Sequence, residues 1–176
     1  SGTEGGSGWS RSRGRGPLLT SPFQKERWFT VNPENRSIEV LMVEDSPDDV
    51  ELAREALREG KLGIGLHVSA DGVEGLAFLR REGKHAEAPA PDLILLDLNM
   101  PRMDGRELLA EIKADEELAR IPVVVLTTSE AERDIVASYK LHANCFISKP
   151  VDFEKFIEIV QAIEEFWFKI VKLPNR

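Results

Sequence analysis

The feature that most constrains the fold is an alternation of short apolar runs with helix-start signals, repeated five times after Ser37. The clearest apolar run covers residues 93–96, and its four side chains are all Leu or Ile. A continuous run of this kind is typical of a strand buried on both faces of a parallel sheet. The alternation therefore predicts an α/β domain in which helices cover both faces of a parallel sheet.

The expected strands and helices follow from these signals. The expected strands lie at residues 38–43, 66–68, 91–97, 121–126 and 145–147. The expected helices are capped by Ser46, Asp71, Asp104, Ser129 and Asp152, and the last reaches about Val171. Glu74 and Glu132 complete expected capping boxes at Asp71 and Ser129. With right-handed crossovers, the units predict a flavodoxin-like, doubly wound sheet of five strands in the order 2-1-3-4-5, with five helices.

The first 36 residues differ from the rest in composition. They are rich in Gly, Ser, Arg and Pro and show no sustained hydrophobic periodicity. We therefore interpret residues 1–36 as a flexible N-terminal tail and residues 37–173 as one folded domain. Only 26 residues follow Pro150, so we expect no separate output domain.

The charge is unevenly distributed along the chain. Residues 1–36 contain six basic and three acidic residues, whereas residues 37–176 contain 17 basic and 28 acidic residues. Because nucleic-acid binding needs a basic surface, we expect the acidic domain not to bind nucleic acid. Its negative charge favours a cationic partner surface or a bound metal ion.

Cysteine content and hydropathy bear on location. Cys145 is the only cysteine, which excludes an internal disulfide and a cysteine-based zinc site. No apolar run approaches the roughly 20 residues that span a bilayer. These features predict a cytoplasmic protein that makes no membrane contact.

Five polar residues stand at the carboxyl ends of the expected strands. They are Glu44 and Asp45 after the first strand, Asp97 at the third, Thr127 at the fourth and Lys149 at the fifth. Doubly wound folds bind ligands at this edge of the sheet. Three neighbouring carboxylates repel one another unless a cation joins them, and Mg²⁺ suits carboxylates, waters and an incoming phosphate. We therefore expect a magnesium site at this edge.

Asp97 is central among these residues and is the expected nucleophile. Attack of an aspartate on a phosphoryl donor gives an acyl phosphate. Phosphoryl transfer requires in-line positioning and neutralised phosphoryl oxygens. The metal ion, Lys149 and Thr127 can each neutralise one of the three non-bridging oxygens.

Four stretches resemble the receiver domain of bacterial two-component response regulators. They are residues 43–46 (Val-Glu-Asp-Ser), 96–105 (Leu-Asp-Leu-Asn-Met-Pro-Arg-Met-Asp-Gly), 126–129 (Leu-Thr-Thr-Ser) and 148–150 (Ser-Lys-Pro). The resemblance extends in order over about residues 37–172. It implies a stand-alone response regulator that a sensor histidine kinase phosphorylates and that signals through conformational change and protein contacts. Such a protein catalyses its own phosphorylation and dephosphorylation and turns over no external metabolite.

The resemblance also implies a role for each site residue. Asp97 would be the phosphoacceptor. Mg²⁺ would be held by Asp45, Asp97 and the backbone carbonyl of Asn99, with Glu44 acting through a coordinated water.

A second group of residues would carry the switch. Thr127 would supply the switch hydroxyl and Phe146 its aromatic partner, while Lys149 would contact the phosphoryl group. The resemblance implies a cis peptide bond between Lys149 and Pro150.

Other stretches narrow the resemblance. Residues 43–49, 141–146 and 166–174 are similar to those of the small regulators that pair with bacterial phytochrome kinases. A bacteriophytochrome is therefore the candidate kinase partner. His142 stands where many receiver domains have Gly.

The last expected helix carries more apolar residues than one face can bury. Those expected to face the core are Phe153, Phe156, Ile157, Val160, Ile163, Trp167 and Ile170. Ile159, Phe166 and Phe168 lie off this stripe, and exposed apolar groups of this size indicate an interface. We expect a homodimer or partner surface at the fifth strand and last helix. Coverage by the tail near Trp28 is the alternative.

Two other functions are weighed against the phosphorylation switch. A magnesium phosphohydrolase usually has its nucleophile at the end of the first strand and an acid two residues later. Here Asp45 is followed by Ser46 and Pro47, which argues against this enzyme. The other alternative is a receiver domain that binds partners without phosphorylation, which the complete set of site residues disfavours.

Overall fold

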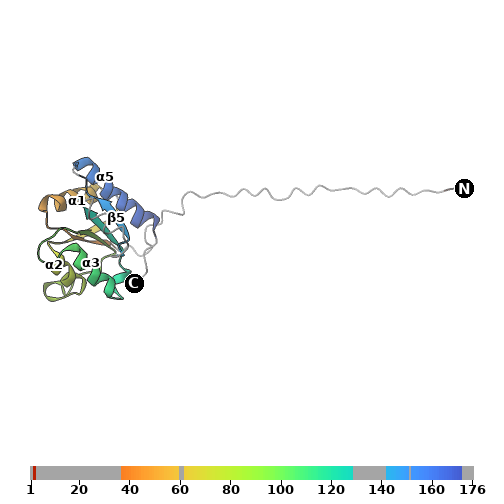
Figure 1. Ribbon diagram of the computed structural model, residues 1–176. Coiled ribbons are helices and arrows are strands. Elements are labelled where there is room, and N and C mark those ends of the chain that lie inside the picture. Colours follow the sequence, from red (N-terminus) through yellow and green to blue (C-terminus); the bar gives the residue numbers. More distant parts are fainter. Residues whose placement is uncertain (1, 3–36, 60–61, 129–141, 151, 172–176) are drawn as a thin grey trace.

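A five-stranded parallel sheet forms the centre of the computed structural model (Figure 1), which describes residues 2, 37–59, 62–128, 142–150 and 152–171. The strands are β1 (Ile38–Val43), β2 (Ile64–Ser69), β3 (Leu93–Asp97), β4 (Val123–Thr127) and β5 (Cys145–Ser148). Their order across the sheet is β2-β1-β3-β4-β5, and all neighbours pair in parallel. The predicted flavodoxin-like order 2-1-3-4-5 is confirmed.

Four described helices follow strands β1, β2, β3 and β5. They are α1 (Pro47–Glu59), α2 (Gly72–Leu79), α3 (Gly105–Ala114) and α5 (Phe153–Glu164). Short 3₁₀ turns lie at Gly83–His85 and Leu118–Arg120, and a π-helical segment, η3 (Glu165–Ile170), continues α5. The helix expected to start at Ser129 and Glu132 lies outside the described residues, as does the expected tail except Gly2.

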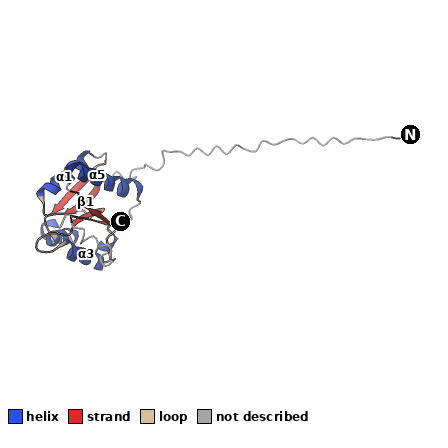
Figure 2. Ribbon diagram, turned by 45° about the horizontal axis from the view of Figure 1, so that its top comes forward, coloured by secondary structure: helices blue, strands red, loops and turns tan. Residues whose placement is uncertain are grey.

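The helices cover both faces of the sheet (Figure 2). Side chains of β1 alternate between the two sides: Val40 packs in the core beneath α1 and α5, and Leu41 packs in the core beneath α2 and α3. Strand β3 is buried along its whole length. A sheet covered in this way leaves the strand ends as the natural place for polar side chains, which positions the site.

Three predicted caps are confirmed and one is only half correct. The Ser46 hydroxyl accepts a hydrogen bond from the Asp49 N–H at 3.3 Å, and Asp104 forms a complete capping box with Glu107. Asp152 caps α5 by accepting from the Lys155 N–H at 3.0 Å. Asp71 caps α2 by accepting from the Glu74 N–H at 2.9 Å. The capping box predicted there is wrong, because the Glu74 carboxylate accepts from the N–H of Ala70, one residue before the cap.

The end of the last helix differs from the expected apolar stripe. Phe156, Val160 and Ile163 are buried as predicted, but Phe153 and Ile170 are exposed by 51% and 68%. Phe153 begins the helix, and a side chain there leans back beyond the first turn. Ile170 lies in η3, where the wider π turn rotates each later residue away from its α-helical direction.

Two residues expected off the stripe pack against the core beneath α1 and α5. Phe168 lies in η3, where the π turn accounts for its inward direction, whereas Ile159 lies in α5 before that segment. Phe166 is half exposed as predicted. The stripe prediction was therefore wrong for Ile159 and Phe168.

The backbone at His142 explains why its position favours glycine. His142 has a φ of 48°, in the left-handed region that side chains with a Cβ rarely adopt. Glycine enters this region at little steric cost.

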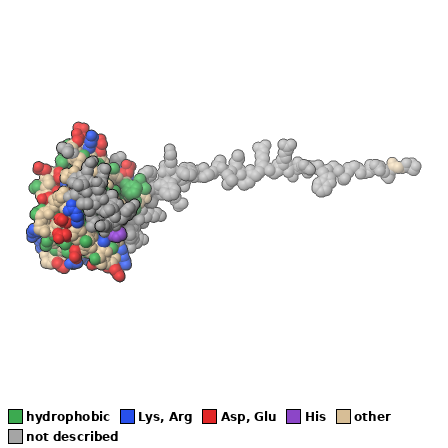
Figure 3. Space-filling model, viewed as in Figure 1, with side chains coloured by type: hydrophobic (Ala, Val, Ile, Leu, Met, Phe, Trp, Pro, Cys, Tyr) green, Lys and Arg blue, Asp and Glu red, His purple; other side chains and the backbone are tan. Residues whose placement is uncertain are grey.

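The described surface carries both signs of charge. Acidic and basic side chains are interspersed over the face of the molecule seen in Figure 3. Among the residues described, no helix has the length and apolar character that crossing a bilayer requires.

Candidate functional site

The expected acidic residues meet at the carboxyl ends of β1 and β3. The two strands are neighbours, with Val43 of β1 in register with Leu96 of β3. Glu44 and Asp45 follow β1 directly, and Asp97 is the last residue of β3. The connections after these two strands leave toward opposite faces of the sheet, which makes this edge the switch point of the fold.

Glu44, Asp45 and Asp97 form an acidic cluster. One carboxylate oxygen from each lies within 4.8 Å of the others, a spacing that fits a single cation. Glu44 and Asp97 are only 2% and 7% exposed, whereas Asp45 is exposed to solvent. Hard oxygen donors at this spacing are the ligands that Mg²⁺ and similar divalent ions prefer.

Burial sets the protonation behaviour of the cluster. It raises the pKa of Glu44 above its ordinary value, with a further contribution from the Asp97 charge and partial relief from Lys149. Burial also raises the pKa of Asp97, while Lys149 and the backbone N–H groups of Asn99 and Leu98 oppose the rise. Both carboxylates therefore gain from a cation that neutralises them.

Lys149 is the cation that the fold itself supplies. It follows β5, and its Nζ donates to Glu44 Oε2 at 2.7 Å and lies 3.7 Å from Asp97 Oδ2. Burial opposes its charge, but hydrogen bonds to Asp49 and Glu44 outweigh that effect and raise the pKa of Lys149. The lysine is thus held in its charged form beside the acidic cluster.

Asp49 is a site residue that the sequence reasoning missed. Its Oδ2 accepts from Lys149 Nζ at 2.8 Å. Asp48 and Asp49 both lie in the first turn of α1, where an acidic residue is ordinarily explained by its favourable interaction with the helix N-terminus. The available signal was their position, since the turn that opens α1 follows β1 and lies beside the carboxyl ends of the strands.

The glycine after Asp104 fixes the backbone around Asp97. A Cβ on Gly105 would overlap the carbonyl oxygen of Asp97, so this position requires glycine. The Gly105 N–H donates to the carbonyl of Leu98 at 3.1 Å, which ties the start of α3 to the loop after β3. This close approach positions the Asp97 carboxylate at the sheet edge.

Three other predicted site residues lie near the same edge. Thr127 ends β4 and is in register with Ser148, but its side chain lies outside the described residues. Phe146 lies in β5, half-buried against the core beneath α2 and α3. Asn99 is exposed and directs its backbone N–H to Asp97.

The prediction of a cis Lys149–Pro150 bond is wrong. The described residues contain no cis peptide bond. A bond preceding proline favours the trans form by about 0.5–1 kcal/mol. Lys149 contacts Glu44 and Asp49 from the trans arrangement, so its placement at the cluster does not need the cis form.

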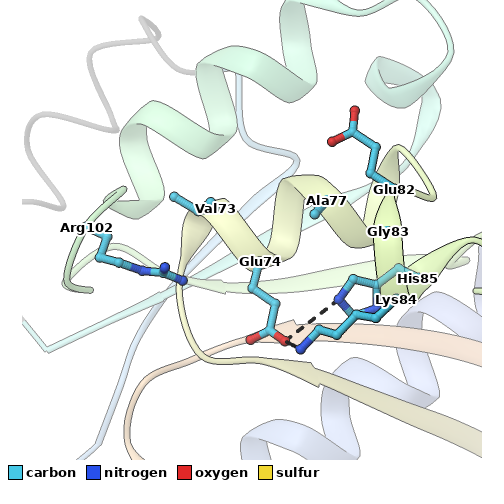
Figure 4. Close-up of a pocket in the computed structure, with 8 residues that line it drawn as sticks. All are labelled: Val73, Glu74, Ala77, Glu82, Gly83, Lys84, His85 and Arg102. Atoms are coloured by element: carbon cyan, nitrogen blue, oxygen red, sulfur yellow. Dashed lines mark hydrogen bonds and ion pairs between the residues drawn. The ribbon is translucent and has the colours of Figure 1, made fainter.

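A shallow pocket lies apart from the acidic cluster, between α2 and the 3₁₀ turn that follows it (Figure 4). Its polar side chains lie close to one another: Glu74 forms an ion pair with Lys84, and the Glu74 carboxylate lies 3.7 Å from His85 Nε2. Arg102 lines the pocket from the loop after β3 and also forms an ion pair with Asp71, the cap of α2. None of the acidic cluster lines this pocket, so we assign the chemistry to the cluster.

Comparison with known proteins gives a consistent result. The response regulator receiver domain family matches residues 40–161. The response regulator Rcp1 of Synechocystis sp. is 48% identical over 135 residues, which cover 77% of this chain and 92% of that protein. The probable methanogenesis regulatory protein FilR2 of Methanothrix harundinacea is 38% identical over 139 residues, which cover 77% of this chain and 87% of that protein.

Solved structures agree with this assignment. The phosphorylated cyanobacterial phytochrome response regulator RcpA superposes with a TM-score of 0.75 at 48% identity, covering 80% of this chain and all of that one. The Mn²⁺-bound form of Rcp1 gives a TM-score of 0.73 at 47% identity, covering 78% and 99%. The sheet order and the acidic cluster agree with the family match and with these relatives. The chain therefore belongs to the response regulator receiver domain family.

Proposed function

We propose that Asp97 is the phosphoacceptor and takes a phosphoryl group from a sensor histidine kinase. Receiver domains of this family act through phosphorylation of an aspartate. The observation that carries the assignment to Asp97 is its place at the end of β3, buried between two further carboxylates and 3.7 Å from the Lys149 ammonium. Lys149 and a divalent ion together would keep the carboxylate ionised although burial raises its pKa.

The covalent step is a displacement at phosphorus. A carboxylate oxygen of Asp97 attacks the phosphorus of a phosphohistidine, forming an O–P bond as the N–P bond breaks. The imidazole nitrogen leaves with the electron pair and takes up a proton. The product is an acyl phosphate on Asp97. Hydrolysis of this acyl phosphate by water returns the protein to its unphosphorylated state.

The donor set of the acidic cluster fits Mg²⁺. We propose that Asp45, Asp97 and the backbone carbonyl of Asn99 bind the ion. Glu44 already accepts from Lys149 through Oε2 and from the Ser46 N–H through Oε1, which favours a role through a coordinated water. The ion, when bound, neutralises charge that develops on the phosphoryl oxygens.

Lys149 and Thr127 are proposed to neutralise the other two phosphoryl oxygens. Movement of the Thr127 hydroxyl toward the phosphoryl group would vacate space for Phe146, which lies half-buried in β5. The core around β4 and β5 would then repack between two arrangements, as in other two-state switches.

We propose a phytochrome-type histidine kinase as the phosphodonor. The support is the 48% identity to a phytochrome response regulator over 80% of this chain. The kinase would present its phosphohistidine at the end of the sheet where Asp97 lies.

The output surface is proposed to be a self-association surface at β5, α5 and η3. Phe166 and Ile170 of η3 are exposed by 50% and 68%, and Phe153 of α5 by 51%. Apolar side chains exposed together on one helical element are typical of an interface. A second copy of the chain is the proposed occupant.

Phosphorylation is tested by incubating the protein with Mg²⁺ and acetyl phosphate and measuring its intact mass. We expect one phosphoryl group per chain in the wild type and none in Asp97→Asn. Asp92→Asn is the matched control, because Asp92 is a buried aspartate just before the same strand. Labelling that survives in Asp97→Asn would refute the assignment.

Two further outcomes of that experiment identify the alternatives. Multiple turnover of a phosphomonoester would indicate a phosphohydrolase. A wild-type protein that acquires no phosphoryl group with Mg²⁺ and donor would indicate a receiver domain that binds partners without phosphorylation.

The association surface is tested by size-exclusion chromatography with light scattering, with and without beryllofluoride. We expect the dimer fraction to rise with beryllofluoride and to fall in Phe166→Asp. The control is Glu165→Gln, because Glu165 is an exposed neighbour in the same segment. Equal masses for all three proteins under both conditions would refute the surface.

A further inference from the structure

The Lys149 ammonium is shared unequally among three carboxylates. Its Nζ lies 2.7 Å from Glu44 Oε2, 2.8 Å from Asp49 Oδ2 and 3.7 Å from Asp97 Oδ2. An ammonium has three donors, and hydrogen bonds to oxygen are made at about 2.7–3.2 Å. Two donors are therefore engaged by Glu44 and Asp49, and the proposed nucleophile lies just beyond direct hydrogen-bond distance.

Asp49 reaches Lys149 from an element that lies outside the acidic cluster. It is the third residue of α1, and its backbone N–H donates to the Ser46 hydroxyl at 3.3 Å, which fixes the first turn. Its side chain is 26% exposed, whereas that of Lys149 is 6% exposed. Asp49 is not a member of the three-carboxylate group that could hold a cation. Its contact with Lys149 thus serves the lysine rather than the metal ion.

The competing contact for Lys149 is an ion pair with Asp97. The ammonium of Lys149 and the carboxylate of Asp97 attract each other at this separation. Among the described contacts, the hydrogen bonds to Glu44 and Asp49 are those that keep the ammonium away from Asp97. A direct pair of about 2.8 Å would occupy an oxygen lone pair of the nucleophile and use the lysine's remaining donor. The oxygen that accepts from Lys149 would then be a poorer nucleophile, because one of its lone pairs is engaged by the ammonium.

We propose that Asp49 is a positioning residue that holds Lys149 off Asp97, so that the Asp97 carboxylate is free to attack the phosphodonor. This inference rests on the proposed role of Asp97 and extends it. Asp49 touches neither phosphodonor nor metal ion. It acts through Lys149.

The kinetic test compares wild type with Asp49→Ala, Asp49→Asn and Asp48→Ala, using acetyl phosphate and Mg²⁺. The rate of phosphorylation is measured over a range of donor concentrations, which separates the maximal rate constant from the half-saturating concentration. We expect Asp49→Ala to lower the maximal rate constant about tenfold, as for loss of one charge-assisted hydrogen bond. Asp49→Asn keeps an acceptor oxygen and should fall between Asp49→Ala and wild type.

Asp48→Ala is the matched control. Asp48 is exposed and lies in the same first turn of α1, so the variant removes the same charge from the same helix end. Loss of charge alone would change the half-saturating concentration of the anionic donor equally in Asp48→Ala and Asp49→Ala. A maximal rate constant for Asp49→Ala equal to that of Asp48→Ala would overturn the proposal.

A structural measurement tests the same inference independently of phosphorylation. Crystal structures of wild type and Asp49→Ala should differ in the distance from Lys149 Nζ to Asp97 Oδ2. We expect direct hydrogen-bond distance in the variant and a longer separation in the wild type. An unchanged distance would refute the role of Asp49, whereas a wild type that acquires no phosphoryl group would refute only the function proposed for Asp97.

Discussion

Among single residues, Lys149 balances the charge of the site. It contacts Glu44, which is 2% exposed and receives little stabilisation from water. Removal of one partner from a buried ion pair costs more than the pair contributes, because the remaining charge stays in a low-dielectric environment. The acidic site therefore depends on this one side chain whenever no divalent ion is bound.

Lys149→Met should lower the free energy of unfolding by about 3 kcal/mol without divalent ions. The double variant Lys149→Met/Glu44→Gln should recover much of the loss, because Gln leaves no uncompensated charge at that position. Urea denaturation at neutral pH with EDTA measures both, and Lys155→Met is an exposed control. Equal stabilities of the single and double variants would show that packing, not charge, causes the loss.

His142 carries backbone strain that a single substitution can relieve. A φ of 48° costs a residue with a Cβ about 1–2 kcal/mol. Glycine avoids this cost, but its larger conformational entropy in the unfolded state offsets part of the gain. His142→Gly should therefore raise the free energy of unfolding by about 1 kcal/mol. His142→Ala keeps the Cβ and should bring no gain, so a gain in urea denaturation for Ala as large as for Gly would contradict the backbone explanation.

At the scale of elements, the junction of α5 and η3 contains a buried carboxylate. Glu164 is 3% exposed, and its Oε1 has no hydrogen-bond partner among the described residues. Burial raises the pKa of Glu164, which Lys169 and the Leu62 backbone N–H partly oppose. The folded state thus binds this proton more tightly than the unfolded state does.

This proton linkage has a defined sign. Between the unfolded-state pKa, near 4.5, and the raised folded-state pKa, stability falls as pH rises, because the folded state binds more protons. Glu164→Gln removes this dependence and should be more stable than wild type at neutral pH, with the difference shrinking toward pH 4.5. Urea denaturation across this range measures it, with Glu165→Gln as the exposed control. A pH-independent difference would contradict the linkage.

At the scale of the whole molecule, the site joins elements that are distant in sequence. Glu44 and Asp45 follow β1, Asp97 ends β3, Lys149 follows β5, and Asp49 lies in α1. A cation bound by the acidic cluster therefore binds only the folded chain. Such binding stabilises the fold in proportion to the logarithm of the cation concentration.

Saturating Mg²⁺ should raise the free energy of unfolding by about 2.7 kcal/mol at one hundred times its dissociation constant. Asp45→Asn should lose most of this gain, because it removes an exposed member of the cluster while leaving Lys149 in place. Urea denaturation against Mg²⁺ concentration tests this, with NaCl at matched ionic strength as control. A gain of the same size with NaCl would indicate general screening rather than a site.

The sequence by itself determined the order of the strands, the starts of the four described helices and the acidic edge of the sheet. Apolar runs such as residues 93–96 and caps such as Asp104 are local patterns, and local patterns specify local structure. Glu44, Asp45 and Asp97 could be assigned together because carboxyl ends of parallel strands meet at one edge of a sheet.

The tertiary structure alone decided the contacts that cross the fold. Asp49 and Lys149 are 100 residues apart in sequence, and only the folded chain brings the first turn of α1 to the residue that follows β5. The π-helical end of α5 turned Ile170 outward and Phe168 inward, against the expected stripe. These outcomes depend on how whole elements pack, because side chains from separate segments compete for the same space and the same charges, and no local pattern in the sequence records that competition.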